Sequence, residues 1–456
     1  MNAEYQRMEA ALEAYRDYEG LCEIDREEVR HRGLQLTWNR EKSLFIPDSP
    51  REDGTVTTYV RAEAQTKMGL STGCVVREGG DPSYDELLKE ALTLGRTLGQ
   101  YRKEPIREKA EYHTGVFESE AAGDGRSFSE LRSLGENIGR QVMDMVPELK
   151  EGDFSLSVYS GLRIHREGTA NNRGLAARDE SCSYEIRIFV FDREYLLTAA
   201  VGEDPDMESL LDVLQMDMAI YKAEADESMN VKISGYEGPA VLSGAALNSW
   251  LITAWKHFTD TADADGTSCF AGKKGEGIGP ELLSLWDVPE WKGRGYIRRT
   301  DSKGGMAREV KIIDRGYMQE LLSSDRANAG RTATLVRSYG IQTVPRNTVL
   351  LPGEASLREM TDRGEVLYIY EIFDEFHGLD ISTGIFNYPC KAALLKDGQV
   401  KGILERVTLT GNSREFLKNI ETLGRDLLQQ ELVIMETYMV MAPAALCSHV
   451  KLSGNG

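Results

Sequence analysis

The sequence predicts an α+β fold in which helices accompany antiparallel sheets in the first half and short strands dominate the second. Three observations lead to this prediction: helices with capping signals, strands with two-residue alternation, and a hairpin signal in the second half. The chain has 456 residues, of which 41% are hydrophobic and 28% charged, so it can bury a large core without disulfides or metal.

Two stretches of the first half have the pattern of amphipathic helices that begin at a serine. In SYDELLKEALTLGRTLG, Ser83 precedes Glu86 by three positions, and Ser127 precedes Glu130 by the same spacing. This spacing is the capping box, in which each side chain accepts a hydrogen bond from the backbone N–H of the other residue. Apolar residues then recur at helical spacing, and Pro147 marks the end of the second helix.

Period-two alternation identifies strands further along the chain. The stretches FSLSVYS (154–160) and YEIRIFVF (184–191) place apolar side chains at alternate positions, which is typical of antiparallel sheets with one wetter face. In ALLKDGQVKGIL, Asp397 and Gly398 separate two apolar runs and predict a tight hairpin.

A change of composition in the middle of the chain predicts two domains. A third helix is expected over roughly residues 206–228, and the stretch MNVKISGYEGP (229–239) then has the glycine and proline of a connector. We therefore expect an N-terminal α+β domain over residues 1–228 and a β-rich C-terminal domain over residues 229–456.

The charge argues against nucleic acid as a partner. Lysine and arginine total 54 against 74 acidic residues, which gives a net charge of −20, and the densest basic group, at 294–303, lies among glycine and aspartate. The six cysteines form no CxxC pair, which indicates free thiols in a reducing compartment. No apolar run approaches the ~20 residues that span a bilayer, and the N-terminus lacks an apolar signal core, so we expect a cytoplasmic protein without membrane contact.

The glycine-rich stretch GTSCFAGKKGEGIG (266–279) does not have the spacing of a nucleotide site. A phosphate-binding P-loop needs serine or threonine after its Gly-Lys pair and a glycine five residues before it. Here Lys274 follows Gly272 and Lys273, and Thr267 occupies the earlier position. The stretch is therefore interpreted as a mobile or closely packed loop.

The helical stretch WLITAWKHFTD (250–260) contains one isolated histidine. A helical zinc protease site needs two histidines on one face and a glutamate as general base. His257 has Thr253 four residues before it, and no second histidine or glutamate lies between them. We interpret His257 as a packed or solvated residue.

Five stretches, taken together, resemble one protein family. They are SGYEGPAVLSGAAL (234–247), GTSCFAGKKGE (266–276), PRNTVLLPG (345–353), LDISTGIF (379–386) and LERVTLTGNSREFLKNIETLGRDL (404–427). Their order and spacing resemble the TldD/PmbA family. The resemblance implies a mixed N-terminal domain, a C-terminal domain whose antiparallel strands form a barrel-like sheet, and a dimer.

The resemblance also implies a division of labour. TldD-type members carry a His-Glu-x-x-x-His helix and a C-terminal cysteine that hold a metal, and they hydrolyse peptides; PmbA (TldE)-type members lack these ligands. The pair matures or degrades peptides, and family members have also been named modulators of DNA gyrase. Anchored on GTSCF, the ligand helix falls near Thr253, Lys256 and His257, and residues 429–443 contain no cysteine. The sequence therefore resembles the metal-free PmbA/TldE branch, with no catalytic residue and no metal in this chain, and with zinc expected in a TldD-type partner.

Such a subunit is expected to bind an unfolded peptide by adding it to an exposed strand edge. The candidate cleft residues lie in two glycine-containing segments: Gly266, Thr267, Ser268, Gly272, Ser382, Thr383 and Gly384. The partner would be a TldD-like subunit or a second copy of the chain. Two alternatives stay open: a scaffold homodimer without hydrolytic activity, and a thiol-dependent peptidase that uses Cys269, Cys390 or Cys447.

Overall fold

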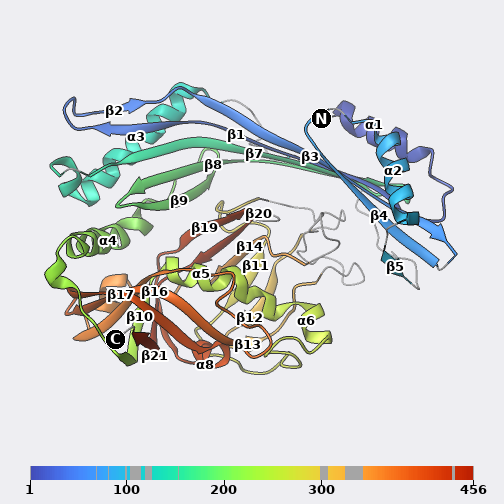
Figure 1. The fold of residues 1–456 in the computed structure, drawn as a ribbon. Helices are drawn as coiled ribbons and strands as arrows, with labels where there is room; N and C mark the ends of the chain where they lie inside the picture. Colours follow the sequence, from blue (N-terminus) through green and yellow to red (C-terminus); the bar gives the residue numbers. More distant parts are fainter. Residues whose placement is uncertain are drawn as a thin grey trace.

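The computed structural model describes residues 2–67, 69–80, 82–97, 100–102, 115–118, 126–152, 154–297, 307–323, 343–433 and 437–454. These residues form an α+β fold with a large mixed sheet of 15 strands and a second sheet that closes into a five-stranded barrel (Figure 1). The predicted fold class is confirmed. None of the described helices is long and apolar enough to cross a membrane.

The N-terminal half supplies long antiparallel strands that arch over the rest of the molecule in Figure 1. Their order in the large sheet is β9-β8-β7-β1-β3-β4-β5, while β2 pairs with β1 and β6 pairs with β8 in parallel. Their bounds are β1 (Cys22–Asn39), β2 (Leu44–Pro47), β3 (Arg51–Thr66), β4 (Gly69–Glu78), β5 (Gln100–Arg102), β6 (Gly115–Glu118), β7 (Ser157–Asn171), β8 (Ala176–Val190) and β9 (Arg193–Ala200).

Helices cover this arch in separate places. At one end α1 (Asn2–Glu13) and α2 (Tyr84–Thr97) lie together, and α3 (Phe128–Met145) packs on β1 and β7 at the other end (Figure 1). The capping box of α3 is confirmed, because Glu130 N donates to Ser127 Oγ at 3.2 Å and Ser127 N donates to Glu130 Oε2 at 2.7 Å. A 3₁₀ turn over Pro147–Lys150 follows α3.

The third expected helix is shorter than predicted. The α-helix α4 covers Leu211–Glu224, and 3₁₀ turns at Glu208–Leu210 and Glu227–Met229 flank it. Local side-chain caps explain both turns: Ser209 N donates to Asp206 Oδ1, and Ser228 N donates to Asp226 Oδ1.

The barrel of the C-terminal half closes in the order β10-β15-β16-β17-β21-β10, and β18 lies beside β21. The barrel-like expectation is confirmed, although β10 and β15 pair in parallel. Asp397 (φ 50°) and Gly398 (φ 72°) form the predicted hairpin turn between β16 and β17. The bounds are β10 (Gly235–Leu242), β15 (Glu365–Ile372), β16 (Ile385–Lys396), β17 (Gln399–Asn412), β18 (Ile420–Leu423) and β21 (Ala445–Gly454).

Six further strands of the C-terminal half extend the large sheet in the order β13-β12-β11-β14-β20-β19-β9. They are β11 (Leu285–Val288), β12 (Val310–Asp314), β13 (Tyr317–Met318), β14 (Asn347–Leu350), β19 (Leu428–Val433) and β20 (Thr437–Ala442). This sheet contains strands from both sides of residue 229. The expected domain boundary near that residue stays a prediction.

The central helix α5 (Gly244–Ala254) lies between the barrel and the large sheet, where it contacts β15, β19 and β20 (Figure 1). It tightens into a 3₁₀ turn at Trp255–Phe258, and α6 (Asp260–Ala264) follows. Two short helices, α7 (Leu357–Thr361) and α8 (Ser413–Lys418), complete the C-terminal half. Nearly every side chain of α5 is buried, so this helix is a core element.

Candidate functional site

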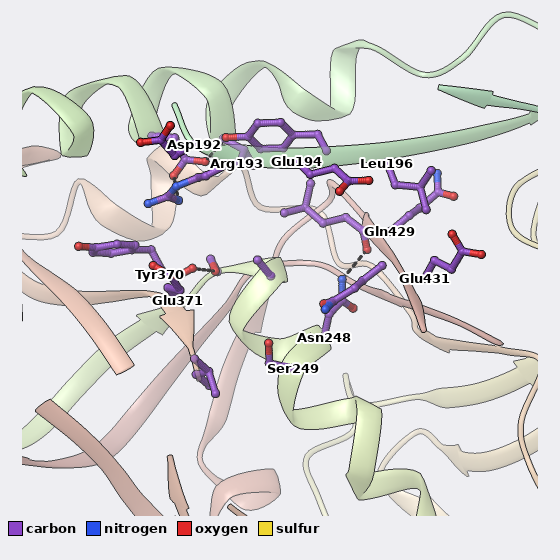
Figure 2. A pocket seen from close by; sticks show the side chains of 18 of the residues that line it. Asp192, Arg193, Glu194, Leu196, Asn248, Ser249, Tyr370, Glu371, Gln429 and Glu431 are labelled. Atoms are coloured by element: carbon purple, nitrogen blue, oxygen red, sulfur yellow. Dashed lines mark hydrogen bonds and ion pairs between the residues drawn. The ribbon is translucent and has the colours of Figure 1, made fainter. Parts of the chain in front are cut away.

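A cavity of about 530 Å³ lies where the N-terminal arch meets the C-terminal half (Figure 2). Its walls come from β9, α4, the N-terminal half of α5, β15 and β19. Its volume falls within the range of small-ligand pockets. Figure 2 shows Asn248 and Gln429 on one side of the cavity and Arg193 and Tyr370 on the other.

The facing edges of β9 and β19 open at this cavity. Within the described residues, a single antiparallel pair, Gln429 with Leu196, joins the two strands, although each is fully paired on its other side. Thr198 Oγ1 donates to Gln429 Oε1 at 2.6 Å and secures that pair. Backbone groups on unpaired strand edges can bind an added strand.

An ion pair with a buried carboxylate forms the wall opposite α5. Arg193 Nη1 donates to Asp217 Oδ1, and the Tyr195 hydroxyl donates to Asp217 Oδ2, both at 2.5 Å. Burial raises the pKa of the Asp217 carboxyl above its ordinary value, and Arg193 opposes that rise. Burial and the adjacent Asp217 also raise the pKa of Tyr195, which therefore stays a hydrogen-bond donor.

A second charged network borders the cavity near β19. Arg187 donates to Glu185 at 2.7 Å, to Glu194 at 2.5 Å and also to Glu431, and Arg163 donates to Glu431 at 2.8 Å. Burial alone would raise the pKa of Glu185, but hydrogen bonds and charges from His31 and Arg187 outweigh it and lower the pKa to about 2. The arginines of this wall are therefore already neutralised.

The N-terminal end of α5 also lies at the cavity. Ser243 caps the helix by accepting from Ala246 N at 3.0 Å, and its hydroxyl also lies 3.2 Å from the carbonyl oxygen of Tyr370. Asn248 donates from Nδ2 to the carbonyl oxygen of Leu428 at 2.9 Å. Its Oδ1 is buried and has no hydrogen-bond partner within the described residues.

The C-terminal end of α5 leads to the predicted remnant of a metal site. His257 is 1% exposed, with Nε2 3.1 Å from Ser413 Oγ and Nδ1 3.4 Å from Ser268 Oγ and 3.7 Å from Cys269 Sγ. Burial lowers the pKa of His257 to about 4 and raises the pKa of Cys269, so both groups are neutral at pH 7.

These donors do not fit a catalytic zinc ion. Such a site has three protein ligands from histidine, cysteinate or carboxylate. Here one imidazole is surrounded by two hydroxyls and a protonated thiol, and Thr253 Oγ1 is occupied by the carbonyl oxygen of Glu375 at 3.2 Å. Lys256, which is exposed, adds a cation. Across the described ranges, no three His, Cys, Asp or Glu side chains group as metal ligands.

The two glycine-containing segments predicted for the peptide cleft meet each other beside His257. Cys269 N donates to the carbonyl oxygen of Ile381 at 2.9 Å. Gly384 has φ 76°, and a Cβ there would lie 2.7 Å from Cys269 Sγ, so only glycine fits. The glycines therefore serve close packing at this junction.

The predicted cleft residues lie outside the cavity walls. Ser268 and Gly384 are buried, whereas the other five are exposed: Gly266, Thr267, Gly272, Ser382 and Thr383. Gly272 N donates to Asp263 Oδ1 at 2.7 Å, and Asp380 Oδ1 accepts from Ser382 N at 2.9 Å. Peptide contact by these seven residues stays a prediction.

The fold brings the thiol of Cys269 next to His257, a contact that the sequence did not predict. Cys269 lies against His257, whereas burial raises the pKa of Cys390 and Cys447 to about 12. Sequence reasoning also missed Arg193, Asp217 and Asn248. An asparagine within the apolar run of α5, next to Leu247, was the available signal.

The sequence of this chain is similar to sequences of known metalloproteases. Residues 235–454 match the PmbA/TldA metallopeptidase C-terminal domain. A zinc metalloprotease TldD homolog of Saccharolobus solfataricus is 24% identical over 311 residues, which is 63% of this chain and 67% of that protein. A metalloprotease of Methanothermobacter thermautotrophicus is 30% identical over 179 residues, which is 36% of this chain and 38% of that protein.

Solved structures share the fold over nearly the whole chain. TldE from Thermococcus kodakarensis has a TM-score of 0.71 at 16% identity and covers 98% of this chain and 100% of its own. A candidate DNA gyrase modulator from Bacteroides thetaiotaomicron has a TM-score of 0.72 at 14% identity and covers 100% and 99%. Identity at this level shows the fold alone. By the sequence match, residues 235–454 of this chain belong to the TldD/PmbA metallopeptidase family.

Proposed function

We propose that the chain is a metal-free, PmbA/TldE-like subunit that pairs with a metal-bearing TldD-type subunit of a peptidase. One observation carries this proposal: where the family's ligand helix is expected, Thr253 and the single imidazole of His257 are used in packing. Zinc and the hydrolytic water would come from the partner, and this chain would help to hold the substrate.

The substrate in this proposal is an unfolded peptide that lies in the cavity bordered by β9 and β19. Main-chain hydrogen bonds to a strand edge give affinity without selecting side chains, which suits a peptidase that accepts varied sequences. The single pair between Gln429 and Leu196 leaves the neighbouring backbone groups available to such a strand. The walls of the cavity include the buried side chains of Asp217 and Asn248.

Co-expression tests this proposal. The chain is produced alone and together with a TldD-type relative, and each preparation is assayed for zinc and for hydrolysis of an unstructured fluorogenic peptide. We expect less than about 0.1 zinc per isolated chain and no hydrolysis by it, because the chain lacks the three ligands of a catalytic zinc site. A complex that co-purifies with the TldD-type relative should hydrolyse the peptide in a zinc-dependent way. One zinc per isolated chain, or failure to form any complex, would contradict the proposal.

The contact between Cys269 and His257 favours one alternative, a thiol-dependent peptidase. Nucleophilic cysteines need a base within hydrogen-bond reach, and 3.7 Å meets the geometric part of that requirement. Burial keeps both groups neutral, and Cys269 is 3% exposed and lies outside the cavity walls, so a substrate in the cavity does not reach the sulfur in this conformation. Peptide hydrolysis by the isolated chain that iodoacetamide abolishes would replace the first proposal with this one.

A further inference from the structure

The amide of Asn248 has an unused hydrogen-bond acceptor in the wall of the cavity. The side chain is 1% exposed, and its Nδ2 donates to the carbonyl oxygen of Leu428, which fixes the orientation of the amide. Oδ1 consequently faces away from Leu428, and no donor of the described residues reaches it. A buried acceptor without a donor costs about 1–3 kcal/mol, so a ligand N–H at this point would recover that energy.

The charged residues that line the cavity have a negative balance. The acidic ones are Asp192, Glu194, Asp217, Glu371 and Glu431, and the basic ones are Arg187 and Arg193, so five negative and two positive charges leave three negative. The next layer does not change this balance, because Glu185 and Glu224 offset Arg163 and Lys391.

The positive charges are also the ones already engaged. Arg193 pairs with Asp217, and Arg187 pairs with Glu194 and Glu431. Asp192 makes no ion pair within the described ranges and is exposed at the cavity rim. An arriving anion would meet no free cation among the lining residues, whereas an arriving cation would meet at least one free carboxylate.

The N-terminus of α5 at the same cavity favours an anion. Its macrodipole is equivalent to about half a positive charge, and Ser243 already satisfies the N–H of Ala246. Half a charge is smaller than the three net negative charges of the lining. The electrostatic balance therefore favours a cation.

We propose that this cavity is a subsite for a cationic N–H donor of an extended peptide, either an α-ammonium group or a lysine or arginine side chain, with Asn248 Oδ1 accepting its hydrogen bond. This inference rests on the proposed peptide-binding function and adds a substrate class to it. A peptide in the cavity beside the start of β19 would pass within reach of Asn248, because Leu428, which holds the amide, is the first residue of β19.

Calorimetric titration of the full chain with three matched pentapeptides tests the subsite. The first is acetyl-AAKAA-amide, the second replaces lysine with norleucine, and the third is AAAAA-amide with a free N-terminus. We expect the lysine peptide, the free-amine peptide or both to bind about tenfold more tightly than the norleucine peptide, which is the effect of one hydrogen bond to a charged group. The two cationic peptides distinguish a side-chain ammonium from an α-ammonium.

Variants locate the effect. Asn248→Leu, which keeps the branched shape of the side chain without the amide, should abolish the tenfold preference, and Asp192→Asn should reduce it about threefold, as expected for an exposed charge. Asn tolerates the φ of 60° at position 192, so this variant remains informative if Asn248→Leu does not fold. Glu421→Gln, an exposed carboxylate on β18, is the control and should leave all three affinities unchanged.

The outcomes separate the subsite from the proposed function. Equal binding of all three peptides would overturn the cationic subsite and leave peptide binding intact. Weaker binding of the cationic peptides, with a gain when a C-terminal carboxylate replaces the amide, would assign the cavity to anions through α5. Binding of no peptide would overturn the proposed function and the subsite together.

Discussion

The two ends of α5 meet their surroundings in opposite ways. At the C-terminal end, both ring nitrogens of His257 and the hydroxyl of Thr253 have partners within the protein, and both side chains are buried. At the N-terminal end, Asn248 keeps an unused acceptor beside a cavity of about 530 Å³. The unused acceptor therefore lies about two turns away from the segment where the family resemblance places the metal-ligand helix.

The largest expected effect concerns the cavity wall. Replacing Asp217 with alanine leaves Arg193 without its buried partner, and breaking such a pair costs about 3–5 kcal/mol of the free energy of unfolding. Asp144→Ala removes a carboxylate from the exposed pair with Lys150 and should change stability by less than about 1 kcal/mol. Chemical denaturation of both variants measures the difference, and equal effects would mean that this wall is not a rigid part of the site.

The closed end of α5 should show its burial through pH. The pKa of His257 is about 4 in the folded state against 6.5 for a free imidazole, so the unfolded chain binds the proton more tightly. Stability from this group is therefore complete above pH 6.5 and is lost as pH falls through 4. The wild type should lose about 3 kcal/mol more than His257→Gln between pH 7 and pH 4, from 1.36 kcal/mol per pKa unit.

Denaturation curves at several pH values check this difference. Parallel loss of stability in the wild type and in His257→Gln would mean that the imidazole is hydrated, which would remove the contrast between the two ends of α5.

Two glycines near His257 differ in how closely they are packed. Gly384 and Gly266 both have positive φ, but only at Gly384 would a Cβ meet an atom, Cys269 Sγ at 2.7 Å; at Gly266 nothing lies within 4 Å. Gly266→Ala should cost about 1 kcal/mol from backbone strain alone. Gly384→Ala should cost about 2–4 kcal/mol because overpacking adds to the strain. Thermal denaturation of the pair measures the packing contribution, and equal losses would contradict a tight junction.

The last prediction concerns the labelling rates of two thiols and involves no change in stability. Cys74 is exposed and Cys269 is buried against His257, so iodoacetamide should label Cys74 first and Cys269 at least about 100-fold more slowly, as expected for inert structural cysteines. Mass spectrometry of the labelled chain gives both rates. Rapid labelling of Cys269 would show that this end of α5 opens to solvent.

Local patterns predicted local structure well. The capping box at Ser127 and the turn at Asp397 depend on neighbours within a few residues, and both occur as predicted. The strand expected over 154–160 was underestimated, because β7 runs from Ser157 to Asn171 and is buried on both faces, which removes the alternation. Polar residues in it, such as His165 at 2.8 Å from Glu27, are paired across strands that the sequence does not place together.

The candidate site was less predictable for a related reason. The resemblance located the segment at Thr253 and His257, but the cavity is assembled from β9, α5 and β19, whose contacts span much of the chain. Arg193, Asn248 and Glu431 have no spacing that links them in sequence. The contact between His257 and Cys269 depends on how the loop over 266–279 folds back, which glycine spacing does not specify.

The order of barrel strands has a consequence for the time course of folding. The pairing of β10 with β21 joins residues 235–242 to residues 445–454, so the barrel cannot close until a segment about two hundred positions further along has been synthesised. The antiparallel arch needs no residue beyond Ala200 for its own ladder. On the ribosome the arch can form early, whereas α5 is synthesised before the strands β15, β19 and β20 that it packs against.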